Sequence, residues 1–126
     1  MGRIFIEHTD DIPWGPRKSG KPGRDGYIGS DGRTKFVGDP ELGPWVIVME
    51  RYGNSMTPVH SHSTDEVLYV ISGEARVGGQ ACKPGTVAYI EKGTPYSIEA
   101  GPEGVTLLNV RPGVAGMHVV ERPTEA

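Results

Sequence analysis

Two histidines and a glutamate stand close together in the middle of the chain, in the order His60, Ser61, His62, three residues, Glu66. Alternate residues of an extended strand face the same side, so the spacing predicts that His60 and His62 project together. Two imidazoles and one carboxylate can hold a divalent transition metal and leave coordination positions open for other ligands. The triplet therefore indicates a metal site.

Glu66 opens an apolar run that has the pattern of a strand. The alternation of Glu66 with Leu68 and Val70 predicts that the carboxylate faces inward among apolar neighbours. A buried carboxylate without a partner is costly. We therefore expect Glu66 to bind either a metal ion or a hydrogen-bond donor.

Composition favours an all-β protein. The chain has 126 residues, the size of one modest domain, and its 19 glycines and 11 prolines are spread throughout. The formal net charge of −3 favours neither a nucleic acid nor a membrane surface as a partner. The single cysteine, Cys82, and the absence of an apolar leader at the start favour a reducing, cytoplasmic location.

Short apolar runs separated by glycine and proline predict many strands. We expect strands at 45–51, 59–62, 66–72, 75–77, 80–83, 86–91, 96–99, 105–111 and 117–120. Gly73-Glu74 is expected to turn the chain, and Gly78-Gly79 is typical of a tight hairpin. Regular strands of this kind predict a sandwich or a small barrel over residues 45–120. A C-terminal tail is expected at 121–126.

Residues 1–44 are expected to pack on the barrel as a short strand and a loop. The strand, at 3–7, could pair with the body of the molecule or with a second subunit. The segment 14–35 is rich in glycine, proline and basic residues, which is typical either of a solvated loop or of a lid that contacts anions over the site. The residues alone leave this role open.

Residues 45–111 resemble the cupin superfamily of small, RmlC-like jelly-roll barrels. Its first motif is filled by Gly53, His60, His62, Glu66 and Gly73, with the first spacer one residue longer than usual. Its second motif is matched at Gly85, Gly93 and Thr94-Pro95 but departs from the family at three positions. Glu91 stands in place of proline, Tyr96 in place of histidine and Ala100 in place of asparagine.

The resemblance implies a divalent metal (Fe, Mn, Ni or Zn) held by His60, His62 and Glu66, with Tyr96 at the fourth position. A neutral phenol ligates metals poorly unless the metal lowers its pKa. Tyr96 is thus a weak ligand, a hydrogen-bond donor to water or substrate, or a core aromatic. Because Asn109 and Arg111 share a strand face, they are expected to line the interior.

These residues lead to two functional hypotheses. The first is a metal-dependent enzyme that acts on a small organic molecule inside the barrel, of oxygenase, isomerase or cyclase type, with Tyr96 and Glu66 as catalytic residues. The second is a non-catalytic cupin that binds a metal or small molecule, or that has lost its metal. The opposite face of the Glu66 strand, with Val67, Tyr69 and Ile71, predicts a homodimer.

Overall fold

The computed structural model of the chain describes residues 2, 4–16, 26–38, 44–113 and 117–120. Apart from one turn of 3-10 helix, η1 (Thr9–Asp11), its regular elements are strands. They are β1 (Gly32–Val37), β2 (Trp45–Arg51), β3 (His60–His62), β4 (Glu66–Val77), β5 (Gln80–Cys82), β6 (Val87–Ile90), β7 (Ile98–Arg111) and β8 (Met117–Val119). None of the described helices is long and apolar enough to span a membrane.

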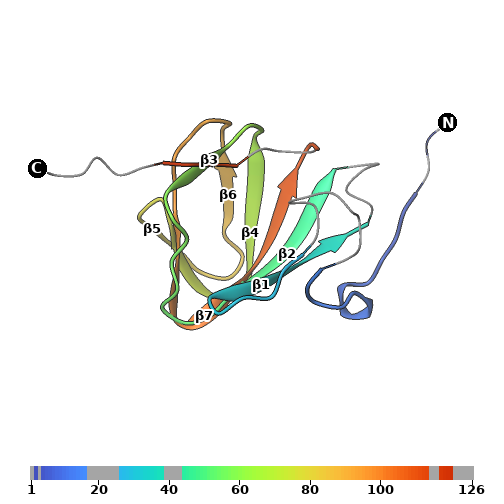
Figure 1. Cartoon of the computed structure of the whole chain (residues 1–126), viewed down its shortest axis with the longest axis horizontal. Coiled ribbons are helices and arrows are strands. Elements are labelled where there is room, and N and C mark those ends of the chain that lie inside the picture. The colour runs from blue at the N-terminus through green and yellow to red at the C-terminus, as the bar shows by residue number, and fades with distance from the viewer. Residues whose placement is uncertain (1, 3, 17–25, 39–43, 114–116, 121–126) are drawn as a thin grey trace, which may run out of the picture.

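The strands form one large antiparallel sheet and one small one. The large sheet has the order β1-β2-β7-β4-β5, with β6 also paired to β4, and the small sheet joins β3 to β8. Figure 1 shows the long strands β4 and β7 curving through the molecule, with β3 near one end of it. This is the all-β jelly-roll architecture expected from the sequence.

The larger of two apolar clusters among the described residues lies between β4 and β7, and Phe36, Trp45 and Ile47 form the smaller one. The larger cluster contains the side chains of β4 and β7 that point inward, among them Leu68, Val70, Ile98 and Leu107, together with Tyr96. Along β4 the exposure alternates, because Glu66, Leu68 and Val70 are buried while Tyr69 and Ile71 are exposed. The inward orientation predicted for Glu66 is therefore confirmed.

Two strands are longer than the sequence pattern indicated. Gly73-Glu74 does not turn the chain, because β4 continues past it with register shifts opposite β7 at Val70/Ser72 and Gly73/Ala75. Likewise, β7 runs without a break through Gly101 and Gly104. Gly73 has a φ of +78°, so this glycine serves a bulge inside a strand rather than a turn between strands. The hairpin predicted at Gly78-Gly79 is confirmed, with a positive φ at both residues.

The N-terminal part contributes a strand that the sequence analysis assigned to a loop. β1 pairs with β2 along its full length, from Gly32 opposite Arg51 to Val37 opposite Val46. Of the strand expected at 3–7, the described residues Ile4 to Glu7 form no strand. Residues 17–25 of the basic segment and the tail 121–126 lie outside the described residues.

The described basic residues of this segment are engaged within the fold. Arg33 forms an ion pair with Glu50 at 3.0 Å and stacks over the Trp14 ring at 4.2 Å. Lys35 is buried and donates hydrogen bonds to the carbonyl oxygens of Thr9 and Ile12. These two cations thus tie the N-terminal segment to the sheet.

Candidate active site

His60 and His62 lie on β3 with both side chains buried, so their predicted common orientation is confirmed. Their ring centroids are 4.8 Å apart. β3 is held between two neighbours, since it pairs with β8 and His60 also exchanges two backbone hydrogen bonds of 2.9 Å with Tyr96. The backbone therefore fixes where both imidazoles stand.

The register between β4 and β7 brings a second group of polar side chains to the same place. Leu68 lies opposite Asn109, so Glu66, two residues earlier, comes close to Arg111, two residues later on the antiparallel strand. Asn109 Nδ2 donates a hydrogen bond of 2.9 Å to Glu66 Oε2, and Arg111 Nε donates one of 3.1 Å to the same oxygen. All three side chains are buried, which confirms that Asn109 and Arg111 face the interior.

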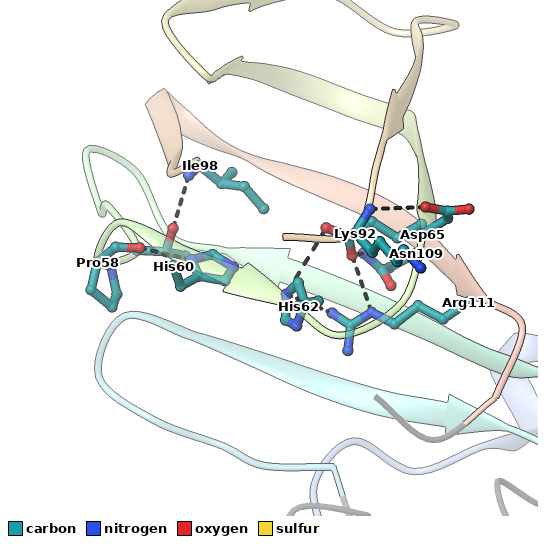
Figure 2. A network of polar contacts seen from close by, with 10 residues as sticks. Pro58, His60, His62, Asp65, Lys92, Ile98, Asn109 and Arg111 are labelled. Atoms are coloured by element: carbon teal, nitrogen blue, oxygen red, sulfur yellow. Dashed lines mark hydrogen bonds and ion pairs between the residues drawn. The ribbon is translucent and has the colours of Figure 1, made fainter. Parts of the chain in front are cut away.

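Arg111 also joins the two groups to each other. Its Nη2 lies 3.1 Å from His62 Nε2, and Figure 2 shows the guanidinium reaching toward that ring. Because a guanidinium can only donate, His62 Nε2 must be the unprotonated ring nitrogen. One cation therefore bridges an imidazole of β3 and a carboxylate of β4.

His60 has the opposite tautomer. Its Nδ1 lies 2.7 Å from the carbonyl oxygen of Pro58, which can only accept (Figure 2). Nδ1 therefore carries the proton, and the lone pair of His60 is on Nε2. Because the side-chain hydrogen bond of His60 uses Nδ1, Nε2 is available to a ligand.

Tyr96 completes the cluster as a neutral phenol. Its ring centroid lies 4.6 Å from that of His60, and the side chain is buried. Burial raises the pKa of Tyr96, and the negative charge of Glu66 raises this pKa further. Tyr96 is thus a hydrogen-bond donor, and its ring is part of the main core.

Glu66 is held in its charged form. Burial alone would raise the pKa of Glu66, but hydrogen bonding from Tyr96 and Asn109 and the charge of Arg111 outweigh it, so the pKa is lowered. Among the described residues, Glu66 Oε1 has no hydrogen-bond partner of ordinary geometry. The carboxylate is therefore ionised, with one oxygen doubly hydrogen-bonded and the other not.

The three predicted metal ligands meet in this cluster, but they do not fit a metal ion as arranged. Among the described residues, no group of three or more His, Cys, Asp or Glu side chains is placed to hold one. His62 Nε2 and Glu66 Oε1 are 3.9 Å apart, while Arg111 donates to His62 Nε2 and to Glu66 Oε2. The metal-ligand role of His60, His62 and Glu66 stays a prediction.

Other residues singled out from the sequence lie apart from the cluster. Glu91 and His118 are exposed, Ala100 is part of the apolar core, and Cys82 is buried there. Arg51 is buried and donates to Tyr27 Oη at 2.7 Å and to Asp31 at 2.9 Å. It is occupied by the contact between β2 and the segment before β1.

A cavity of about 530 Å³ opens around β5. Its walls include Asn54, Arg76, Cys82, Lys83 and Glu99, and none of the predicted site residues. No histidine is among the residues that line it. The polar cluster is therefore the better candidate for chemistry, because it gathers buried titratable groups whose pKa values are shifted.

The comparisons with known proteins concern the fold. No protein-family model matches the chain, and no curated protein sequence matches it. The polyketide cyclase RemF from Streptomyces resistomycificus superposes with a TM-score of 0.75 and 20% identity, over 97% of this chain and 89% of RemF. An RmlC-like cupin protein from Ralstonia eutropha superposes with a TM-score of 0.71 and 16% identity, over 94% of this chain and 78% of the other.

Oxalate decarboxylase from Bacillus subtilis is a further structural neighbour, with a TM-score of 0.62 and 25% identity. The match covers 72% of this chain and 27% of the decarboxylase, so this chain corresponds to less than a third of that enzyme. Strand topology and these superpositions agree. The protein has the fold of the cupin superfamily, in its small, RmlC-like jelly-roll form.

Proposed function

We propose that this protein is a cupin enzyme that moves protons on a small carbonyl compound in the barrel interior, in a reaction of isomerase or cyclase type. The observation that carries the proposal is the tautomer of His60. Its Nδ1–H is fixed on the Pro58 carbonyl, so a lone pair on Nε2 is presented within a buried polar cluster. An imidazole held in this way is suited to act as a general base.

The proposed step begins when His60 Nε2 takes a proton from the substrate carbon atom adjacent to a carbonyl group. The C–H electron pair becomes an enolate, and His60 becomes an imidazolium. If the imidazolium returns the proton to a different carbon, the product is an isomer. If the enolate carbon attacks a second carbonyl of the same molecule, a ring closes and the proton goes to the new alkoxide.

The negative oxygen of the enolate needs donors fixed in advance. Arg111 offers the donors that Glu66 and His62 do not use, because its Nη1 forms no hydrogen bond with the described residues and is not fully buried. Glu66 and Asn109 hold Arg111 and each other in place. In this proposal Glu66 and Tyr96 are positioning residues, which differs from the catalytic roles predicted for them from the sequence.

The structural neighbours are consistent with such a reaction. RemF, a polyketide cyclase by name, has this fold over almost the whole chain. At 20% identity the likeness concerns the fold, so the substrate of RemF is a starting point for choosing probes and no more. We therefore expect the substrate to be a small organic molecule with carbonyl or phenolic oxygens.

The test is proton exchange in D₂O, followed by NMR on a panel of small ketones and phenolic ketones. We expect wild type to speed exchange of the hydrogens next to the carbonyl, and His60→Ala to slow it by about 10²-fold or more. Thr64→Ala is the control, since Thr64 lies near the cluster in sequence but takes no part in the step. Exchange at the buffer rate with every compound, or equal rates for wild type and His60→Ala, would refute the proposal.

A non-catalytic cupin is the second candidate. It is favoured by the mutual contacts of Glu66, Asn109 and Arg111, which hold the site together without any ligand. In that case the panel compounds would bind, seen as shifts of the His60 ring signals, without any exchange of their hydrogens. The same NMR experiment therefore separates the two candidates.

A further inference from the structure

We propose that the Arg111 guanidinium is a built-in cation that takes the position a divalent metal would need between His62 and Glu66, so that this chain excludes metal ions from its site. The inference concerns the same cluster as the proposed reaction. Its test measures metal binding and not turnover, so either proposal can fail without the other.

The Arg111 guanidinium lies between the side chains of His62 and Glu66. A single guanidinium donates from Nε to Glu66 Oε2 and from Nη2 to His62 Nε2, each at 3.1 Å. His62 Nε2 is the imidazole nitrogen that a metal in this position would have to contact, and Glu66 Oε2 is one of the two carboxylate oxygens beside it. A nitrogen lone pair that receives a hydrogen bond from arginine cannot bind a metal at the same time.

The positive charge of Arg111 opposes the binding of a second cation beside it. An arginine keeps its positive charge at every pH at which the protein is folded. Arg111 is buried, as are Glu66 and His62, so little water is present to screen its charge from an ion bound a few ångströms away. A divalent ion would therefore be repelled, and Glu66 already has its counter-charge in Arg111.

Without Arg111, the cluster would hold a set of metal-binding atoms. His60 Nε2 carries a lone pair, His62 Nε2 would be released, and Glu66 Oε1 is a buried oxygen without a hydrogen-bond partner. These atoms come from a two-histidine, one-carboxylate set, which is a common set for divalent transition metals. The ligands are thus present, and the arginine makes them unsuitable.

The experiment compares wild type with Arg111→Ala, both purified without a histidine tag, and titrates each with Zn²⁺, Mn²⁺ and Ni²⁺ by calorimetry. We expect no stoichiometric binding to wild type. Arg111→Ala should bind one ion per chain at least about tenfold more tightly than wild type. The reason is that the repulsion between the arginine cation and the metal ion is lost, and this repulsion is appreciable even at the dielectric constant of water. The gained site should disappear in Arg111→Ala/His60→Ala.

Thermal unfolding gives a second measurement that does not require tight binding. Removing Arg111 leaves Glu66 without its counter-charge, so Arg111→Ala should melt at a lower temperature, and metal ions should raise that temperature again while leaving wild type unchanged. Arg111→Gln serves where the alanine variant does not fold. Arg111→Lys, which keeps the charge, should gain no metal site.

Three outcomes would overturn the inference. One is a stoichiometric metal in wild type that is lost in His60→Ala. Another is folded Arg111→Ala and Arg111→Gln proteins that still bind no metal. The third is metal binding by Arg111→Lys as tight as that by Arg111→Ala, because the charge would then not be what excludes the ion.

Discussion

Glu66 owes its state to the three side chains around it. Its pKa is lowered although the residue is buried, because Tyr96, Asn109 and Arg111 all favour the charged form. If Glu66 were only a metal ligand, Glu66→Gln would weaken metal binding without unfolding the barrel. The pairing of Glu66 with Arg111 changes that expectation, because the variant would leave a buried arginine without its counter-charge.

We predict that Glu66→Gln lowers the free energy of unfolding by about 3 kcal/mol, the low end of the cost of breaking a buried ion pair by removing one partner. Urea denaturation measures it. Glu66→Gln/Arg111→Met removes both charges and should recover part of the loss, whereas Glu50→Gln, which breaks the more exposed pair with Arg33, should cost less than about 1 kcal/mol. A Glu66→Gln protein as stable as wild type would show that the buried pair contributes nothing net.

The long strands β4 and β7 meet through glycines that leave no room for a side chain. A Cβ on Gly73 would lie 2.2 Å from the carbonyl oxygen of Gly104, a backbone atom that cannot move away alone. Gly73 also has a φ of +78°. The bulge at this point lets β4 continue along β7 and carries Glu66 and Arg111 into register further along the same pair of strands.

We predict that Gly73→Ala is markedly more destabilising than Gly79→Ala. Both glycines have a positive φ, but a Cβ on Gly79 meets nothing within 4 Å. Gly79→Ala should therefore cost only the backbone term of about 1 kcal/mol, and Gly73→Ala should cost that and the clash in addition. Equal losses of unfolding free energy in the two variants, measured by urea denaturation, would mean that the backbone at Gly73 relaxes enough to accommodate the added Cβ.

One outer face of the molecule remains apolar and open. Tyr69 and Ile71 on β4 and Val87 and Tyr89 on β6 are 41–63% exposed, and Tyr69 lies opposite Val87 in the sheet. The outward position of Tyr69 and Ile71 agrees with the sequence pattern. Contiguous apolar surface of this kind is typical of a contact between protein chains.

We predict a homodimer formed through this face. Light scattering should give twice the mass of the chain for wild type, and Ile71→Lys/Tyr89→Lys should give a monomer, since each subunit would bring two buried charges into the contact. Met56→Lys is the control, as Met56 is also exposed but lies outside β4 and β6. A wild-type monomer at all concentrations would contradict the prediction.

Much of this protein follows from the sequence alone. The period of two in Glu66, Leu68 and Val70 and in His60 and His62 determined which side chains face inward, since alternation is a local property of any extended strand. The same period placed Asn109 and Arg111 inside. An all-β sandwich or small barrel could also be predicted, because glycine and proline separate the apolar runs, and the jelly-roll form was implied by the resemblance to cupins.

Only the tertiary structure decided what these inward groups do. Glu66 and Arg111 are 45 residues apart in sequence, and their contact depends on the register of β4 against β7. The pairing of these strands also contains register shifts at Val70/Ser72 and Gly73/Ala75, and the second of them includes Gly73-Glu74, where the sequence predicted a turn. A strand pattern fixes the face of a side chain but not its partner, so the arginine between His62 and Glu66 became visible only when the strands were paired.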